Sequence, residues 1–208
     1  MRFQDRAAAG RELAERLAHL AKREPIVLGL PRGGVPVAAE IARGLHAPLD
    51  IVLVRKVGAP DRAELAAGAV GEDGVTVRNT AVLHELGLSW SDLADQVEHE
   101  RDEVRRRAES LRPGRNRVSL KDRTVIIVDD GIATGSTVVA ALRVVRRLGA
   151  GWTVLAVPVA PADVVPAMAE LADELVCLRA PARFRAVGQW FQDFSQVSDE
   201  EVRALLQP

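Results

Sequence analysis

Residues 124–137 read Thr-Val-Ile-Ile-Val-Asp-Asp-Gly-Ile-Ala-Thr-Gly-Ser-Thr. The first five residues are apolar or β-branched and lack the alternation of a strand with one face in water. They therefore predict a strand buried on both faces, as in a parallel sheet. From Val138 to Leu148 apolar residues recur at helical spacing, and Gly149 follows, which predicts a helix and its end. This order of strand, turn and helix is one β-turn-α unit.

The turn of this unit has the chemistry of an anion site. Thr134–Thr137 place free backbone N–H groups and hydroxyls at a helix N-terminus, where the donors and the helix dipole favour negative charge. Asp129 and Asp130 just before the turn can only accept hydrogen bonds when ionised, so they suit sugar hydroxyls or a hydrated cation. The stretch thus predicts a site with two halves, a phosphate cradle and a pair of acidic acceptors.

Four further apolar runs alternate with helical patterns along the chain. We expect an α/β fold with an open, mainly parallel five-stranded sheet and helices on both faces, and ligand-binding loops at the carboxyl ends of the strands. The other four strands are expected at 25–30, 49–54, 152–159 and 174–178, and helices at 5–22, 37–43, 91–111 and 162–171.

The remaining segments predict smaller features around this core. Residues 65–70 and 75–77 flank a Gly-Glu-Asp-Gly turn and predict a hairpin at the edge of the sheet, and Ser198 with Glu201 predicts the start of a short helix. We expect one domain, residues 1–208, whose core is about 26–178. A small hood subdomain or arm is expected from 1–24, about 80–115 and 180–208.

Composition excludes several classes of protein. The net charge of −1 gives no general electrostatic surface for nucleic acid. Hydrophobic residues at 48% with 27% charged residues are usual for a soluble globular protein. The single cysteine, Cys177, allows no internal disulfide. No apolar run approaches the ~20 residues of a membrane span, and the polar start is no signal peptide, so we expect a cytoplasmic protein without membrane contact.

Residues 124–137 resemble the 5-phosphoribosyl-1-pyrophosphate (PRPP) motif of the type I phosphoribosyltransferases. The whole pattern, including the loop at 54–60 and the tail at 190–196, resembles a little-characterised bacterial branch of this family. The resemblance implies that Asp129 and Asp130 accept hydrogen bonds from the ribose hydroxyls of PRPP. It further implies that the 5′-phosphate is bound by Ala133, Thr134, Gly135, Ser136 and Thr137. The simpler alternative is that the acids cap a helix, but capping needs one acid and no glycine turn.

The resemblance extends to the loop after the first strand, which in this family binds pyrophosphate and often contains a non-proline cis peptide. Here Arg32, Gly33 and Gly34 occupy that loop, and Arg32 can clamp phosphate oxygens bidentately. The second strand ends at Arg55-Lys56, of which we favour Lys56 as a pyrophosphate ligand. The alternatives are an ordinary turn for the first loop and a solvated strand end for the second.

By this resemblance the protein is a PRPP-dependent phosphoribosyltransferase of nucleotide metabolism. It would transfer the phosphoribosyl group to a nitrogen of a small acceptor, such as a nucleobase, and release pyrophosphate. Mg²⁺ is the implied cofactor, held by Asp129 and Asp130 through water. A loop at 58–74 would close over the pyrophosphate. Two positions depart from the family pattern: Gly131 suggests a looser turn, and Ala133 leaves no candidate for a general acid or base.

Several alternatives remain open at this level. The protein could bind PRPP as a regulator or sensor without turnover. A receiver-like domain would use the two acids to bind Mg²⁺, but such domains carry their acids after the first strand, whereas here the pair follows two earlier β-α units. The charged helix at 91–111 is either a solvated face or an arm on a second subunit of a homodimer. Aromatic residues within 184–194 are a lid over the site, a platform for a base, or packing.

Overall fold

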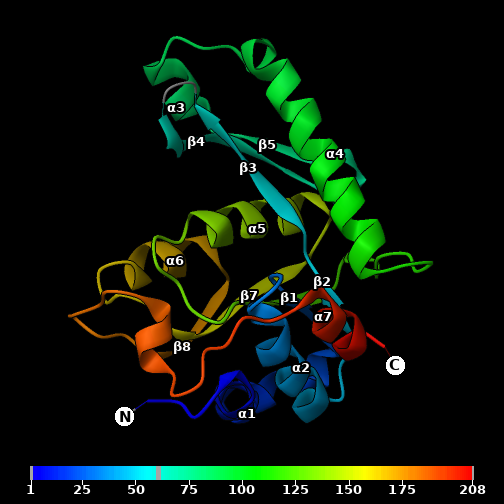
Figure 1. The fold of residues 1–208 in the computed structure, drawn as a ribbon, viewed down its shortest axis with the longest axis vertical. Coiled ribbons are helices and arrows are strands. Elements are labelled where there is room, and N and C mark those ends of the chain that lie inside the picture. The colour runs from blue at the N-terminus through cyan, green and yellow to red at the C-terminus, as the bar shows by residue number, and fades with distance from the viewer. Residues whose placement is uncertain (1, 60–61, 208) are drawn as a thin grey trace.

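The computed structural model describes residues 2–59 and 62–207, and its centre is a five-stranded parallel sheet (Figure 1). All four neighbouring strand pairs in this sheet are parallel, which confirms the predicted class. The order across the sheet is β2 (Leu49–Ile51), β1 (Ile26–Gly29), β6 (Thr124–Val128), β7 (Trp152–Val159) and β8 (Glu174–Arg179).

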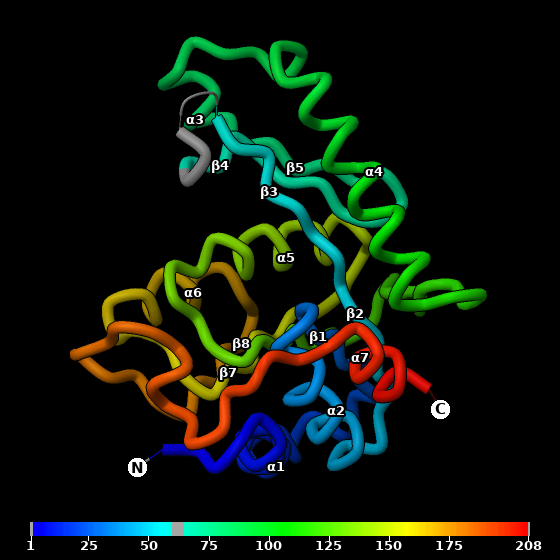
Figure 2. Tube along the Cα trace, viewed as in Figure 1, coloured from blue at the N-terminus to red at the C-terminus, as the bar shows by residue number. Residues whose placement is uncertain are grey.

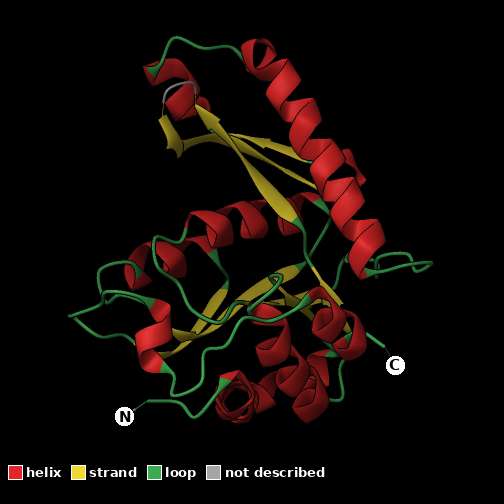
Figure 3. Cartoon of the chain, viewed as in Figure 1, coloured by secondary structure: helices red, strands yellow, loops and turns green. Residues whose placement is uncertain are grey.

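Helices cover both faces of the sheet, as the continuous apolar runs require (Figure 3). The helices are α1 (Arg6–Leu17) and α2 (Gly34–Leu45) on one face, and α5 (Ser136–Arg147) and α6 (Val165–Leu171) on the other. Every residue of β6 is buried. Its alternate residues face opposite sides: Ile127 joins the cluster of α5 and α6, whereas Ile126 joins the cluster of α1 and α2.

The N-terminal helix belongs to this core rather than to the expected hood. Leu13 and Leu17 of α1 and Leu20 of the following η1 (Ala18–Arg23) are fully buried with Ile41 of α2. Burying such a stripe against the sheet stabilises the fold by roughly 1.5–3 kcal/mol per leucine. The apolar face of residues 5–22 was predicted correctly, but it packs on α2 and the main sheet and not in the hood.

A second, three-stranded antiparallel sheet stands apart from the first, over α5 (Figure 1). This small sheet contains β3 (Val54–Ala59), β4 (Arg62–Gly71) and β5 (Thr76–Arg78). The predicted hairpin exists, because β4 pairs with β5 across η2 (Glu72–Gly74). The prediction that this hairpin lies at the edge of the main sheet is wrong. The run at 49–54, expected as one strand, divides after Ile51, and the chain leaves the main sheet.

Most of the segment expected as a closing loop, 58–74, is therefore paired strand. Residues 60–61 of that segment lie outside the described residues. The small sheet packs on α5: a Cβ added to Gly71 would meet Val144. The segment thus stands over the helix that begins at the predicted phosphate site.

The long helix α4 (Ala94–Leu111) packs its narrow apolar stripe on the small sheet. Val97, Val104 and Leu111 are buried in the same cluster as Val57 and Val70. The polar face carries ion pairs three residues apart, including Arg101 with Glu98 at 3.2 Å. The helix is preceded by α3 (Thr80–Glu85) and η3 (Trp90–Leu93).

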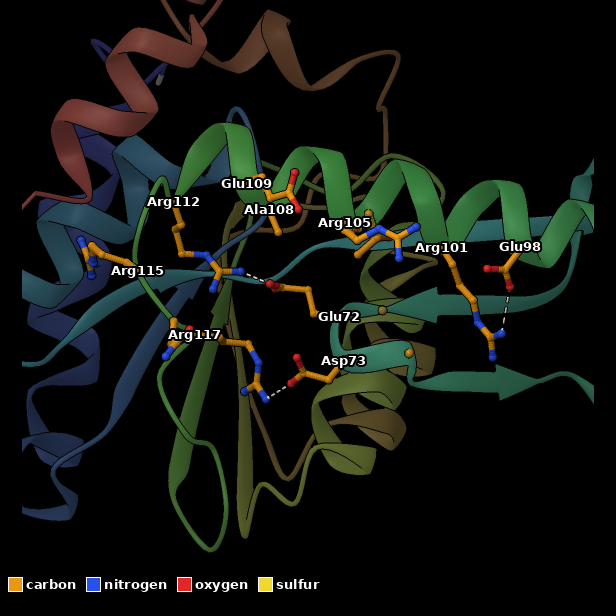
Figure 4. A pocket seen from close by; sticks show the side chains of 14 residues that line it. Glu72, Asp73, Glu98, Arg101, Arg105, Ala108, Glu109, Arg112, Arg115 and Arg117 are labelled. Atoms are coloured by element: carbon orange, nitrogen blue, oxygen red, sulfur yellow. Dashed lines mark hydrogen bonds and ion pairs between the residues drawn. The ribbon is translucent and has the colours of Figure 1, made fainter.

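A buried charge cluster joins the small sheet to the main sheet (Figure 4). Arg112, which follows α4, is paired with Glu72 and lies 3.3 Å from Asp50 of β2, and each of these three side chains is at most 7% exposed. Asp50 also accepts hydrogen bonds from the backbone N–H groups of Ile51 and Val118. Burial lowers the pKa of Arg112, and the nearby Asp50 opposes that shift.

Replacing Glu72 by alanine should lower the free energy of unfolding by about 3 kcal/mol, because it removes a partner of a buried arginine. The neighbouring Asp73 pairs with Arg117 at the surface, and its side chain is 63% exposed. Asp73→Asn is thus the control, because it removes the same charge and asparagine tolerates the left-handed backbone of this residue (φ 57°), and it should cost less than about 1 kcal/mol. Urea unfolding of both variants measures the difference. Equal losses would contradict a special role for the buried cluster.

The N-terminal segment runs beside the segment that follows β8, whereas the two termini themselves lie well apart (Figure 2). Phe3 forms a parallel bridge with Phe191, and Gln4 O accepts a hydrogen bond of 2.9 Å from Asp193 N. The tail then reaches α7 (Asp199–Leu205), whose predicted cap is confirmed, since Ser198 accepts from Glu201 N. Among the described residues, no helix is both long and apolar enough to cross a membrane.

Candidate functional site

The loops after β1 and β6 meet at the carboxyl edge of the sheet. Leu30 N donates to Val128 O at 2.8 Å, and a Cβ added to Gly34 would lie 2.5 Å from Val128 O. A Cβ at Gly33 would lie 2.6 Å from Asp130 Cγ. The two glycines therefore permit the close approach of these loops. The Pro31–Arg32 peptide bond is cis, as the resemblance suggested for this loop.

Residues 131–137 form the phosphate loop, in which the predicted hydroxyl donors Thr134 and Thr137 face solvent. Gly135 adopts φ +79°, a left-handed conformation favoured by glycine, and starts α5. Thr134 and Thr137 are exposed, and Thr134 Oγ1 lies 3.3 Å from Ser136 Oγ. The 12-residue helix α5 supplies unpaired N–H groups at its first turn. These groups form a cradle of the kind that binds a phosphate.

Asp129 and Asp130 follow β6 directly and sit beside this cradle. Asp130 N donates to Asp129 Oδ1 at 2.9 Å. Burial, and next the charge of Asp130, raise the pKa of Asp129 to about 8. The pKa of Asp130 is also raised by burial, while the guanidinium of Arg6, 2.8 Å away, opposes the rise. The pair is thus held in surroundings that favour a ligand with hydroxyl donors or a cation.

This raised pKa makes stability depend on pH. The native state keeps a proton on Asp129 up to pH of about 8, whereas an unfolded aspartate loses it near 3.9, so stability falls as pH rises between these values. Asp129→Asn should reduce the slope of the free energy of unfolding against pH, by at most about 1.4 kcal/mol per pH unit, because one titrating proton is removed. Thermal unfolding from pH 5.5 to 8.5 measures it, and identical slopes in both proteins would contradict the assignment.

The basic residues predicted for pyrophosphate lie at two different places. Lys56 of β3 donates to Ser136 Oγ at 3.1 Å, so the structure brings it to the phosphate loop. Arg32 lies in the loop beside Asp130, but its guanidinium points to the C-terminal helix, where Nη1 is 3.7 Å from Asp199 Oδ1. Arg55 pairs with Glu100 at 2.7 Å. The favoured choice of Lys56 over Arg55 stays a prediction.

The acidic pair is the part of the site that can serve Mg²⁺. Among the described residues there is no group of three His, Cys, Asp or Glu side chains placed to hold a metal. Two adjacent carboxylates nevertheless fit Mg²⁺, because this ion keeps several waters and takes the rest of its ligands from a phosphorylated substrate. Asp129 and Asp130 are the residues that would hold it, through water.

The aromatic tail divides between packing and the site. Phe191 is 3% exposed and packs on Phe3 with ring centroids 5.4 Å apart, so it is core. Phe184 lines a cavity of about 650 Å³ that also borders Ala133 and Thr134. A Cβ at Gly131 would lie 2.5 Å from Val187 Cγ1, so glycine there lets the tail pack directly on the phosphate loop.

Arg6 is the site residue that sequence reasoning missed. Its guanidinium donates to Asp130 and to Ser195 O, both at 2.8 Å, and lies 3.9 Å from the ring centroid of Phe194. Nothing in the local pattern marks it, because its partners are more than 120 residues away in the chain. It joins the acidic pair to the tail.

Comparisons with known proteins agree with this geometry. Residues 3–164 match the family model described as a phosphoribosyl transferase domain. Two proteins of Mycobacterium tuberculosis, from strains CDC 1551 and H37Rv, are 54% identical over 205 residues, or 98% of this chain. Both carry the name "Putative phosphoribosyl transferase". The chain spans about half the length of these relatives, since the match covers 46% of each.

Solved structures show the same fold. The TT1426 protein from Thermus thermophilus superposes with a TM-score of 0.92 at 48% identity, over 99% of this chain and 98% of that one. The AQ2163 protein from Aquifex aeolicus, at 12% identity and a TM-score of 0.50 over 88% of this chain and 78% of that one, shares the fold alone. With the family model matching most of its length, this chain belongs to the phosphoribosyl transferase domain family.

Proposed function

We propose that the protein transfers the phosphoribosyl group of PRPP to a nitrogen of a small acceptor, with release of pyrophosphate. One observation carries the proposal: an acidic pair, Asp129 and Asp130, lies between a glycine-dependent loop after β1 and a phosphate cradle at the start of α5. PRPP has a ribose diol between two phosphate groups. The three parts of the site match its three parts in kind and in order.

In this proposal each part of the chain has one task. The N–H groups and hydroxyls of residues 133–137 hold the 5′-phosphate. Lys56, predicted for the pyrophosphate, lies beside Ser136 and therefore adds its positive charge on the 5′-phosphate side of the site. Asp129 and Asp130 accept from the ribose hydroxyls and fix the sugar ring. The loop after β1 would bind the leaving pyrophosphate through the N–H groups of Arg32 and Gly33, since the N–H of Gly34 donates to Leu30 O at 3.0 Å. Catalysis then comes from positioning the sugar and neutralising the leaving group.

Mg²⁺, when bound with PRPP, would supply charge that stabilises the departing pyrophosphate. The carboxylates that hold it through water must be ionised. The pKa of Asp129, raised to about 8, therefore implies that binding of the Mg²⁺ complex of PRPP at neutral pH releases a proton from this residue.

The acceptor would enter on the side of the cavity lined by Ala133, Pro161 and Phe184. Phe184 offers an apolar ring for a planar base. Ala133 can neither donate nor accept a proton through its side chain, so an acceptor that already carries a nucleophilic nitrogen suits this site best.

Pyrophosphate release tests the proposal. The protein, with PRPP, Mg²⁺ and a panel of purines, pyrimidines and other heterocyclic bases, should release pyrophosphate in the presence of at least one acceptor. A protein that binds PRPP but releases none with any acceptor would support the regulatory or sensing alternative. Absence of PRPP binding would overturn both.

A further inference from the structure

Arg107 of α4 lies far along the chain from both phosphate-binding loops, yet its guanidinium shares a partner with Arg32. Arg107 makes a bidentate pair with Asp199, with Nη2 to Oδ1 at 2.7 Å. Arg32 Nη1 lies 3.7 Å from the same Oδ1. One carboxylate from the first turn of α7 thus serves two arginines from two other elements.

The same arginine borders a small cavity between the loops. This cavity, of about 150 Å³, has Pro31 of the first loop on one side and Thr137 of the phosphate loop on another, and Arg55 and Arg107 also line it. Pro31 adjoins the residues predicted for pyrophosphate, and Thr137 is among those predicted for the 5′-phosphate. Arg107 therefore reaches the space that separates the two predicted phosphate positions.

The chemistry of this arrangement favours exchange of one anion for another. A guanidinium binds the paired oxygens of carboxylate and phosphate in the same bidentate geometry. Two arginines that share one carboxylate have one positive charge in excess, and a diphosphate would neutralise both. The hydrogen bond from Arg107 holds the pKa of Asp199 below its usual range, so the carboxylate is ionised at neutral pH.

We propose that Arg107 is a further pyrophosphate-binding residue, paired with Arg32, and that Asp199 occupies their guanidinium groups until the pyrophosphate group of PRPP replaces it. This inference rests on the proposed function and adds to it a residue from α4 and a competing carboxylate from α7.

The exchange needs only a side-chain movement. Val202 and Leu206 are buried against the core, and Arg203 donates to Ser110 O at 3.2 Å, so the body of α7 stays packed. Asp199 is at the start of the helix and its side chain is 25% exposed. Its carboxylate can turn into solvent when the arginines bind another anion.

Calorimetric titration with inorganic pyrophosphate and with PRPP, each with Mg²⁺, tests the proposal on three variants of the full chain. Asp199→Asn should bind both ligands about three- to tenfold more tightly, because the competing charge is gone. Arg107→Gln, which keeps part of the aliphatic stem, should bind both about tenfold more weakly. Glu200→Gln loses the same charge on the same turn, but Glu200 pairs with Arg203 at the surface. Its affinities should stay within about twofold.

The two replacements are expected to change the affinity in opposite directions, which distinguishes a role in ligand binding from a purely structural ion pair. If the pair only stabilised the fold, both replacements would lower the unfolding temperature and neither would tighten binding, which would overturn the proposal. Unchanged affinity in Arg107→Gln, while Asp130→Asn weakens PRPP binding, would also overturn it and leave the proposed function standing. Failure of the wild-type protein to bind either ligand would instead overturn the proposed function, and this inference with it.

Discussion

Gly34→Ala is expected to abolish PRPP binding and to lower the free energy of unfolding by about 2–3 kcal/mol. The added methyl would lie 2.5 Å from Val128 O and 2.9 Å from Asp129 Cα. Both are backbone atoms of the central strand and the acidic pair, so neither can turn aside. The loops after β1 and β6 must move apart, and the site loses its geometry. Chemical denaturation and PRPP titration measure the two effects.

The neighbouring substitution Gly33→Ala distinguishes an effect on PRPP binding from an effect on stability. Gly33 has φ −62° and ψ −32°, which alanine adopts without strain. The obstacle to its methyl is the Asp130 carboxylate, a side chain that can move. We expect a loss of stability below about 1 kcal/mol but a large loss of PRPP affinity, because Asp130 is displaced. Equal stability losses in the two variants would contradict this account of the loop contact.

Asp130→Asn should weaken PRPP binding by about 30-fold or more, although the side chain keeps its shape. The amide loses one acceptor oxygen and the negative charge, and hydrogen bonds to charged groups contribute about 1.5–3 kcal/mol. Asparagine also leaves Arg6 without its charged partner, although Arg6 keeps its hydrogen bond to Ser195 O. Calorimetric titration with PRPP and Mg²⁺ measures the loss.

Asp173→Asn is the matched control for this substitution. Asp173 accepts from Thr153 N and Oγ1, both at 2.7 Å, next to the start of β7 and thus at the opposite end of the strands from Asp130. Its replacement should lower stability but leave PRPP affinity within about twofold. A fall in affinity as large as that of Asp130→Asn would show that the effect is not specific to the acidic pair.

The main sheet and the phosphate loop could be predicted because their signals are local. Five apolar runs and the order strand, turn and helix are visible in short windows of sequence. The hairpin of β4 and β5 was predicted, but the separate sheet that it forms with β3 was not, for a physical reason. Residues 49–57 continue without glycine or proline, so nothing in the pattern shows that the chain leaves one sheet after Ile51 and enters another at Val54.

The parts of the site that could not be predicted depend on long-range contacts. Arg6 reaches Asp130 from the N-terminal helix, and Asp199 meets Arg32 and Arg107 from the C-terminal one. In the sequence, each is an ordinary charge near the start of an amphipathic helix. Asp50 likewise reads as a misplaced acid in a buried strand until Arg112 supplies its partner. Only the folded chain brings these charges together.

A crystal structure of the protein soaked with PRPP and Mg²⁺ tests the central claim most directly. We expect the 5′-phosphate on the N–H groups of residues 133–137, the ribose hydroxyls on Asp129 and Asp130, and the pyrophosphate at residues 32–34. Electron density for PRPP elsewhere on the protein, or a ribose without contact to either carboxylate, would contradict it.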